Sequence, residues 1–149
     1  TVSGAVNLGL YGSLEFPGGV AENEKIKDAF LRELKEETGI EGQEGVMYWR
    51  QHPIYPMSAE FVGRMHYAVV YLTSPLFSDY VANDGGLKVM ALTPNEVRHN
   101  IQRGIIASGH AAILGWHFYQ DMERARRDEE LLKKLQNEGY ITVEKVRIH

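Results

Sequence analysis

The chain has 149 residues, of which 44% are hydrophobic and 24% charged, and its formal net charge is −4 at pH 7. These values predict a single globular domain over residues 1–149, and the acidic balance argues against a protein that binds a nucleic-acid backbone. Cysteine is absent, which excludes disulfides and thiolate metal sites and fits a cytoplasmic protein. No apolar run reaches the length of a membrane span.

The N-terminal part of the chain predicts two strands, a turn and a helix. Residues 2–11 and 13–16 have strand composition. The segment Pro17-Gly18-Gly19 predicts a turn whose backbone can approach a ligand closely, because glycine has no Cβ. Asn23 is a suitable N-cap for a helix over residues 24–38.

The remaining elements alternate between strands and helices. Gly39 is well placed as the left-handed residue that ends the first helix. Further strands are predicted at 45–52, 61–73, 87–92 and 141–148, and further helices at 94–103, with Thr93 as cap, and at 110–137. The last strand could pair with the N-terminal strand or with a partner chain. This alternation predicts an α/β fold with a mixed sheet flanked by helices.

Three carboxylates lie close together on the first predicted helix. Glu33, Glu36 and Glu37 are spaced at i, i+3 and i+4, so they project from one side of the helix. Glu33 and Glu37 also continue the apolar stripe of Ala29 and Phe30, which should face the protein interior. Acidic side chains are therefore expected where apolar ones would be usual.

This arrangement needs a counter-charge, because like charges one turn apart repel and the last helical turn disfavours negative charge. Arg32 is expected to neutralise one carboxylate, either Glu36 or Glu33. A divalent cation would neutralise the others, and hard oxygen ligands favour Mg²⁺ or Mn²⁺. The alternative is a solvated acidic surface without function.

The segment from Gly18 to Ile40 resembles the Nudix box, G-x5-E-x7-R-E-U-x-E-E-x-G-U, where U is an aliphatic residue. All nine specified positions are filled, by Gly18, Glu24, Arg32, Glu33, Leu34, Glu36, Glu37, Gly39 and Ile40. The resemblance implies a Nudix-type α/β/α sandwich. It also implies an enzyme that hydrolyses a nucleoside diphosphate linked to another moiety.

The same resemblance implies the roles of the box residues. Glu33, Glu36 and Glu37 would hold one or more Mg²⁺ ions against the pyrophosphate, with a backbone group near Gly18 completing the coordination. Arg32 would orient the carboxylates. Glu24 is expected to have a structural or outer-sphere role.

A separate general base has several candidates. Some family members take one from the loop before the last core strand, where this chain has Asp79 and Asp84. An acid beside Gly85-Gly86 also suits an ordinary turn. Glu60 lies near the position of a catalytic-loop acid of some members.

Two markers of substrate class compete after the box. Pro56 lies 17 residues beyond Gly39 and resembles the proline of ADP-ribose pyrophosphatases and nucleotide-sugar hydrolases, as does the segment 14–17 before the box. Tyr55, at 16 residues, fits the tyrosine of dinucleoside polyphosphate hydrolases. Both residues are candidate substrate contacts, and Tyr48, Trp49 and Tyr55 could stack on adenine or belong to the core.

Other functions and assemblies stay open. Nudix-like domains also serve as nucleotide-sensing modules without catalysis, and some members hydrolyse mutagenic nucleoside triphosphates. The related pyrophosphatases are generally homodimers with an N-terminal extension, so the resemblance implies a homodimer and a chain that lacks that extension.

Overall fold

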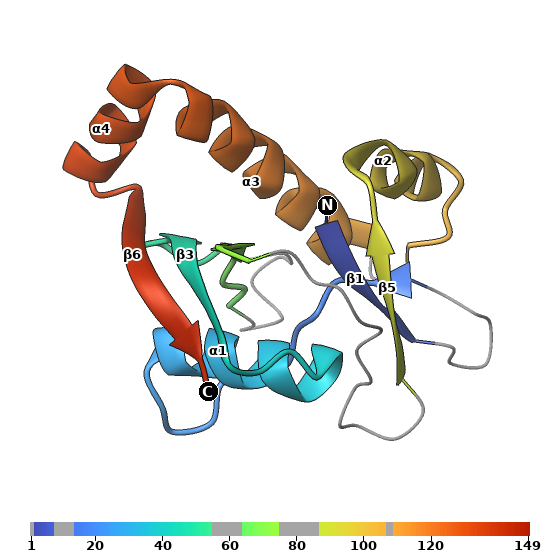
Figure 1. The fold of residues 1–149 in the computed structure, drawn as a ribbon. Coiled ribbons are helices and arrows are strands. Elements are labelled where there is room, and N and C mark those ends of the chain that lie inside the picture. The colour runs from blue at the N-terminus through green and yellow to red at the C-terminus, as the bar shows by residue number, and fades with distance from the viewer. Residues whose placement is uncertain (1, 8–13, 55–63, 75–86, 107–108) are drawn as a thin grey trace.

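The computed structural model describes residues 2–7, 14–54, 64–74, 87–106 and 109–149 (Figure 1). The elements in chain order are β1 Val2–Asn7, β2 Leu14–Glu15, α1 Ile26–Thr38, β3 Gln43–Arg50, β4 Ala68–Leu72, β5 Leu87–Leu92, α2 Pro94–Gln102, α3 Gly109–Arg127, α4 Glu129–Asn137 and β6 Ile141–Ile148. The predicted α/β class is confirmed.

The strands form two three-stranded sheets, with orders β2-β1-β5 and β4-β3-β6. In the second sheet β3 pairs with β4 over Gly45↔Leu72 to Trp49↔Ala68, and with β6 over its whole length. Every pair among the described strands is antiparallel. The sequence predicts a mixed sheet. No parallel pair is found among the described strands.

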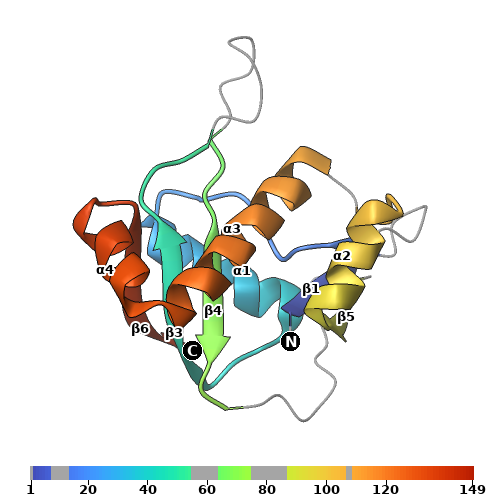
Figure 2. The same ribbon diagram turned by 90° about the horizontal axis from the view of Figure 1, so that it is seen from above.

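The helices cover both faces of the sheet β4-β3-β6. On one face, Phe30 of α1 makes an edge contact with Trp49 of β3, at a centroid distance of 6.4 Å. On the other, the buried Tyr48 of β3 packs with Phe118 and Met122 of α3. Adjacent strand residues point to opposite faces, so α1 and α3 lie on opposite sides. Figures 1 and 2 show this order of layers.

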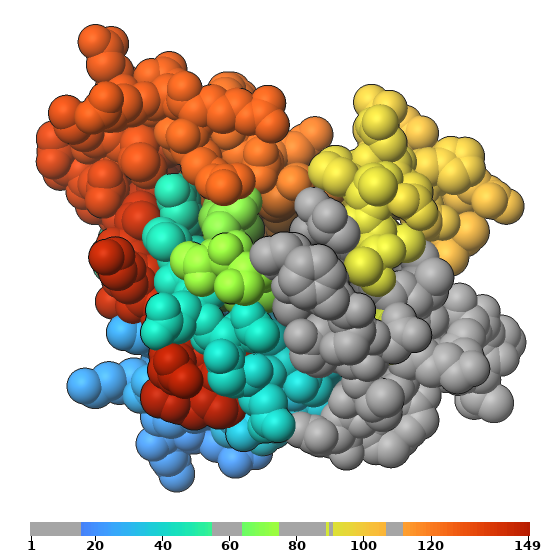
Figure 3. Space-filling view, in the orientation of Figure 1, coloured from blue at the N-terminus to red at the C-terminus, as the bar shows by residue number. Residues whose placement is uncertain are grey.

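Two buried clusters form the core. One joins the sheet β4-β3-β6 to α3 and contains Tyr48, Phe118, Met122 and Ile141. The other joins β5, α2 and the start of α3 and contains Leu92, Val97, Ile106, Ala112 and Trp116. The space-filling view shows α3 and α4 in orange as a layer above the strands (Figure 3). Among the described helices, none is both long enough and apolar enough to cross a membrane.

Several helix boundaries differ from those predicted. The cap of α1 is Lys25, without a side-chain hydrogen bond, and Asn23 instead has a positive φ of 26°. The predicted helix over 110–137 is two helices, because Asp128 leaves the helical conformation and accepts a hydrogen bond from the Leu131 N–H, which starts α4. Thr93 caps α2 as predicted, in a complete capping box.

The strand predictions were partly wrong. β6 pairs with β3 and not with the N-terminal strand β1. β3 lies two residues earlier than the predicted strand 45–52, and β4 covers only five residues of the predicted strand 61–73, of which 61–63 lie outside the described residues. β5 has the predicted bounds, and β1 and β2 fall within the predicted ranges.

Candidate functional site

The acidic residues of the predicted site lie on α1, whose C-terminal end is closed by a glycine cap and by hydrogen bonds of a buried threonine. Gly39 adopts the left-handed conformation, with φ 73°, and its N–H bonds the carbonyl of Lys35. The fully buried Thr38 donates its hydroxyl to the Leu34 carbonyl and accepts the N–H of Ile40. This closure fixes the helical turn that carries Glu36 and Glu37.

Contacts with β3 and β6 hold α1 on the sheet. The indole N–H of Trp49 donates to Glu144 of β6 at 3.2 Å, and Lys27 of α1 pairs with the other oxygen of the same carboxylate at 3.3 Å. Phe30 packs edge-on against the Trp49 ring. One carboxylate therefore joins the helix to both strands.

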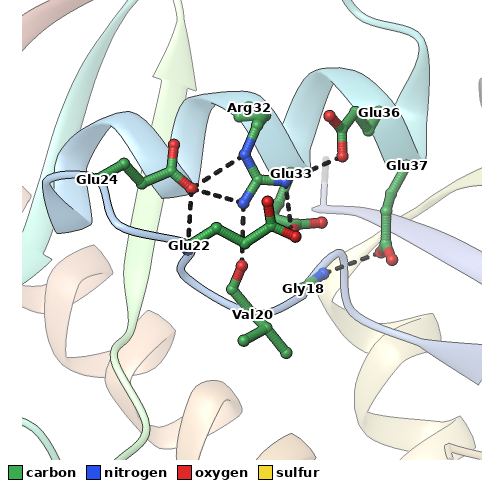
Figure 4. Close-up of polar contacts among 8 residues, drawn as sticks. All are labelled: Gly18, Val20, Glu22, Glu24, Arg32, Glu33, Glu36 and Glu37. Atoms are coloured by element: carbon green, nitrogen blue, oxygen red, sulfur yellow. Dashed lines mark hydrogen bonds and ion pairs between the residues drawn. The ribbon is translucent and has the colours of Figure 1, made fainter.

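Arg32 lies at the centre of the acidic cluster (Figure 4). Its guanidinium pairs with Glu24 at 2.6 Å, with Glu33 at 2.8 Å and with Glu36 at 3.1 Å. It also donates to the backbone carbonyl of Val20 at 2.9 Å. The prediction that Arg32 neutralises a single carboxylate was wrong, because the five N–H groups of a guanidinium can serve several acceptors at once.

These ion pairs shift the pKa values of the residues that form them. The hydrogen bond from Arg32 lowers the pKa of Glu24, and the bonds to Glu24 and Glu33 raise the pKa of Arg32. Both residues are therefore charged at neutral pH. Glu24 is an ion-pair partner of Arg32, and its structural or outer-sphere role stays a prediction.

The glycine loop before α1 lies directly against two of the carboxylates. The Gly18 N–H donates to Glu37 at 2.9 Å (Figure 4). A Cβ on Gly19 would lie only 2.1 Å from Cδ of Glu33, so no larger residue fits there without moving that side chain. The site thus has the backbone of the Gly18-Gly19 loop on one side and carboxylates of α1 on the other.

The donor chemistry of this site fits a hard divalent cation. Three carboxylates on one helix and the adjoining glycine backbone supply the oxygen ligands that Mg²⁺ and Mn²⁺ prefer. Within the described residues, however, no three acidic or histidine side chains converge on one point. The reason is that Arg32 binds Glu33 and Glu36, whereas Glu37 is turned towards the Gly18 N–H. Arg32 supplies the counter-charge in this arrangement.

The other predicted residues either lie outside the described residues or pack within the fold. Tyr55, Pro56, Glu60, Asp79 and Asp84 all lie outside the described residues. Tyr48 is a buried core residue that faces α3, and Trp49 packs against α1. Tyr48 therefore belongs to the core, whereas Trp49 is only partly buried.

Three contributing residues were missed by the sequence analysis. Gly19 belongs to the turn predicted to approach a ligand, and it approaches Glu33. Val20 contributes only its carbonyl, which has no sequence signal. Glu144 lies 95 residues from its partner Trp49, and only knowledge of the strand pairing could connect them.

Comparison with known proteins gives one match. The NUDIX domain model matches residues 6–127, which is most of the chain. No curated protein and no solved structure gives a significant match. Because the family match covers the acidic helix, the glycine loop and most of both sheets, the chain belongs to the Nudix family, whose members are pyrophosphohydrolases of nucleoside diphosphate derivatives that generally use divalent metal ions such as Mg²⁺.

Proposed function

We propose that this protein is a Mg²⁺-dependent diphosphatase that cleaves ADP-ribose or a similar nucleotide sugar into a nucleoside monophosphate and a sugar phosphate. The observation that carries the proposal is the contact of the Gly18-Gly19 loop with Glu33 and Glu37 of α1. It brings a glycine backbone that a ligand can approach together with carboxylates suited to a hard cation. The Pro56 marker and the segment 14–17 support the choice of substrate class.

The roles of the residues follow from their contacts. Glu33, Glu36 and Glu37 would hold the cation, which supplies charge neutralisation of the phosphates and activation of water when bound. Arg32 would fix the orientation of Glu33 and Glu36 through the bonds that it already makes to them. Glu24 and the Val20 carbonyl would keep Arg32 in place.

The Gly18-Gly19 loop would contribute a close backbone approach and a hydrogen-bond donor. Gly19 lets the loop backbone lie against the Glu33 carboxylate, because a Cβ at this position would occupy the same space. Glu37 is the carboxylate bound to the loop backbone, through the Gly18 N–H. In the proposed mechanism, Glu37 would accept a proton from an attacking water in an in-line displacement at phosphorus.

The test is the substitution Glu37→Gln, which preserves size and removes the charge. We expect it to abolish Mg²⁺-dependent formation of AMP and ribose 5-phosphate from ADP-ribose, while the circular dichroism spectrum stays that of the wild type. The matched control is Glu41→Gln, just beyond the helix, where the side chain is 67% exposed and pairs with Lys35. Near-normal turnover by Glu37→Gln would contradict the proposal.

A panel of substrates tests the substrate class separately. ADP-ribose, a sugar nucleotide and diadenosine tetraphosphate are incubated with the protein and Mg²⁺, and the products are identified. Release of ATP from the tetraphosphate with no cleavage of ADP-ribose would favour the polyphosphate hydrolases instead. Calorimetric binding of a nonhydrolysed analogue without any product from the panel would favour a sensing module.

Assembly as a homodimer and a cytoplasmic location are part of the same proposal, by analogy with the related pyrophosphatases. Light scattering tests the first point directly. A monomeric mass at micromolar concentration would remove the homodimer from the proposal and leave the chemistry of the site unchanged.

A further inference from the structure

A small pocket lies between α3, α4 and the strands β3 and β6, on the opposite face of the sheet from α1. Its volume is about 260 Å³, and its apolar lining includes Phe118, Met122, Leu131, Leu135 and Ile141, with Arg50 as a cationic member. Arg50 and Ile141 are directly paired residues of β3 and β6, so both point to the face that α3 and α4 cover. The pocket is therefore an apolar space with a positive charge in its wall.

The charge of Arg50 is not compensated within the part of the chain that the structure describes. Its Nε is buried and has no hydrogen-bond partner. The one carboxylate in the same pocket belongs to Asp121, which pairs with Arg124 at 3.1 Å. A buried donor of a charged group that makes no hydrogen bond is costly, and an anion in the pocket would remove that cost.

The surroundings of Arg50 are aromatic and apolar. The N–H of Arg50 bonds the carbonyl of Tyr67, and burial raises the pKa of Tyr67 while the nearby charge of Arg50 opposes that rise. Tyr67 in turn packs near Phe118, at a centroid distance of 6.4 Å. The Nε of Arg50 is thus buried at a pocket that it shares with Phe118, Met122 and Ile141 of the apolar cluster.

We propose that this pocket binds a small carboxylate with a hydrocarbon chain, with the carboxylate on Arg50 and the chain against α3 and α4. A single guanidinium matches a single carboxylate in charge and in its two-oxygen geometry. A phosphate monoester would bring nearly two negative charges next to Asp121. The volume lies below the usual range for ligand pockets, which excludes a nucleotide as occupant.

The site is separate from the proposed hydrolytic site. Strand alternation places Trp49, which contacts α1, on one face and Arg50 on the other, and Figure 1 shows α1 and the α3–α4 pair on opposite sides of the strands. The proposal does not depend on the hydrolytic activity. Substitutions of Arg50 are expected to leave that activity unchanged.

The test is calorimetric titration of the full chain with butyrate, hexanoate and octanoate, and with 1-octanol as the uncharged probe. The affinity should rise about fourfold per added CH₂ group, as expected for burial of a hydrocarbon chain. Octanoate should bind more tightly than octanol. Hydrogen exchange should show that octanoate protects the amides of α4, which forms one wall of the pocket.

Variants identify the group that binds the carboxylate. Arg50→Gln should weaken octanoate binding about tenfold or more, because a charge-assisted hydrogen bond is lost, and leave octanol binding unchanged. The matched control is Arg124→Gln, which removes an arginine of the same pocket that is already paired with Asp121. It should change octanoate binding by less than about threefold.

Two further variants keep the test decisive if Arg50→Gln does not fold. Arg50→Lys keeps the charge but loses the two-donor geometry, so octanoate should bind with intermediate affinity. Leu135→Trp should fill the pocket and abolish binding of both octanoate and octanol. The proposal is overturned if octanoate does not bind at millimolar concentration, if octanoate and octanol bind alike, or if Arg124→Gln is as damaging as Arg50→Gln.

Discussion

Gly19 lies so close to Glu33 that a Cβ on the glycine would be 2.1 Å from the carboxylate carbon. Glu33 cannot easily move aside, because Arg32 holds its carboxylate at 2.8 Å and its side chain is only 17% exposed. The neighbouring Gly18 is different, since the nearest atom to its Cβ would be the Phe16 carbonyl oxygen at 3.9 Å. Two adjacent glycines thus have different tolerance for a side chain.

Gly19→Ala is therefore expected to displace the Glu33 carboxylate and lower ADP-ribose hydrolysis about 100-fold, the effect of a misplacement of about 1 Å. The free energy of unfolding should change by less than about 1 kcal/mol, because the loop is exposed. Gly18→Ala is the matched control and should keep near-normal activity. Equal activity of the two variants would show that the Glu33 position is not needed for turnover.

Arg32→Gln tests the role of the arginine as internal counter-charge. The substitution leaves Glu24, Glu33 and Glu36 without their shared partner, so we expect the metal-free variant to unfold at a lower Tm than the metal-free wild type. Added Mn²⁺ should then raise the Tm more in the variant than in the wild type, since the cation relieves a larger repulsion.

Lys35→Gln is the control for that experiment. Lys35 is on the same helix but pairs with the exposed Glu41 at 3.4 Å, an interaction of small energy. Its Tm with and without Mn²⁺ should match the wild type. If Arg32→Gln and Lys35→Gln gave the same metal-induced Tm shift, the proposed role of Arg32 would be excluded.

The acidic helix was predicted well because its signals are local. Gly39 ends α1 where the sequence predicts, since glycine adopts a positive φ without strain. The spacing of Glu33, Glu36 and Glu37 fixes the side of the helix from which they project. What this spacing cannot give is the conformation of Arg32, because two of its partners, Glu24 and the Val20 carbonyl, depend on how the segment before α1 folds back over the helix.

The parts that the sequence could not predict depend on distant contacts. Residues 110–137 contain no proline that would mark a break. The break at Asp128 follows from a cap bond to the Leu131 N–H together with the packing of Leu132 and Leu135 on the sheet cluster. The pairing of β6 with β3 joins segments that are about 100 residues apart, and no local pattern specifies it.

Gly45→Ala tests how closely β3 and β4 approach. A Cβ on Gly45 would lie 2.7 Å from the backbone oxygen of Tyr71, and a paired backbone cannot shift freely. We expect the variant to lose about 2 kcal/mol of unfolding free energy, as in an overpacked core. The measurement is urea denaturation followed by circular dichroism.

Gly115→Ala provides the comparison for Gly45→Ala. Its Cβ would meet the Tyr67 ring at 3.3 Å, a side chain that can turn slightly. Alanine also gains about 1 kcal/mol over glycine inside a helix. The stability of this variant should lie between that of the wild type and a value about 1 kcal/mol higher. If Gly115→Ala lost as much unfolding free energy as Gly45→Ala, the Tyr67 ring would be unable to move aside.

The capping box of α2 should make part of the stability depend on pH. Glu96 accepts the Thr93 N–H at 3.1 Å, while its own N–H donates to the Thr93 hydroxyl at 3.2 Å. The bonds from Thr93, the backbone N–H first, lower the pKa of Glu96 below its ordinary value of 4.5. A lowered pKa means that the ionised side chain favours the folded state. Its contribution is therefore present above pH 4.5 and is lost as the pH falls through the folded-state pKa.

Glu96→Gln keeps the shape of the side chain and removes the charge, so it should be less stable than the wild type at pH 7, with a smaller difference at pH 3. Urea denaturation at both pH values measures this. The comparison is Thr93→Ala, which removes the capping hydroxyl and should cost about 1 kcal/mol at pH 7. It should keep most of the pH dependence of the wild type, because the backbone N–H of residue 93 is the larger cause of the lowered pKa of Glu96 and is still present. A difference between Glu96→Gln and the wild type that is the same at pH 3 and pH 7 would mean that the charge of Glu96 does not stabilise the cap.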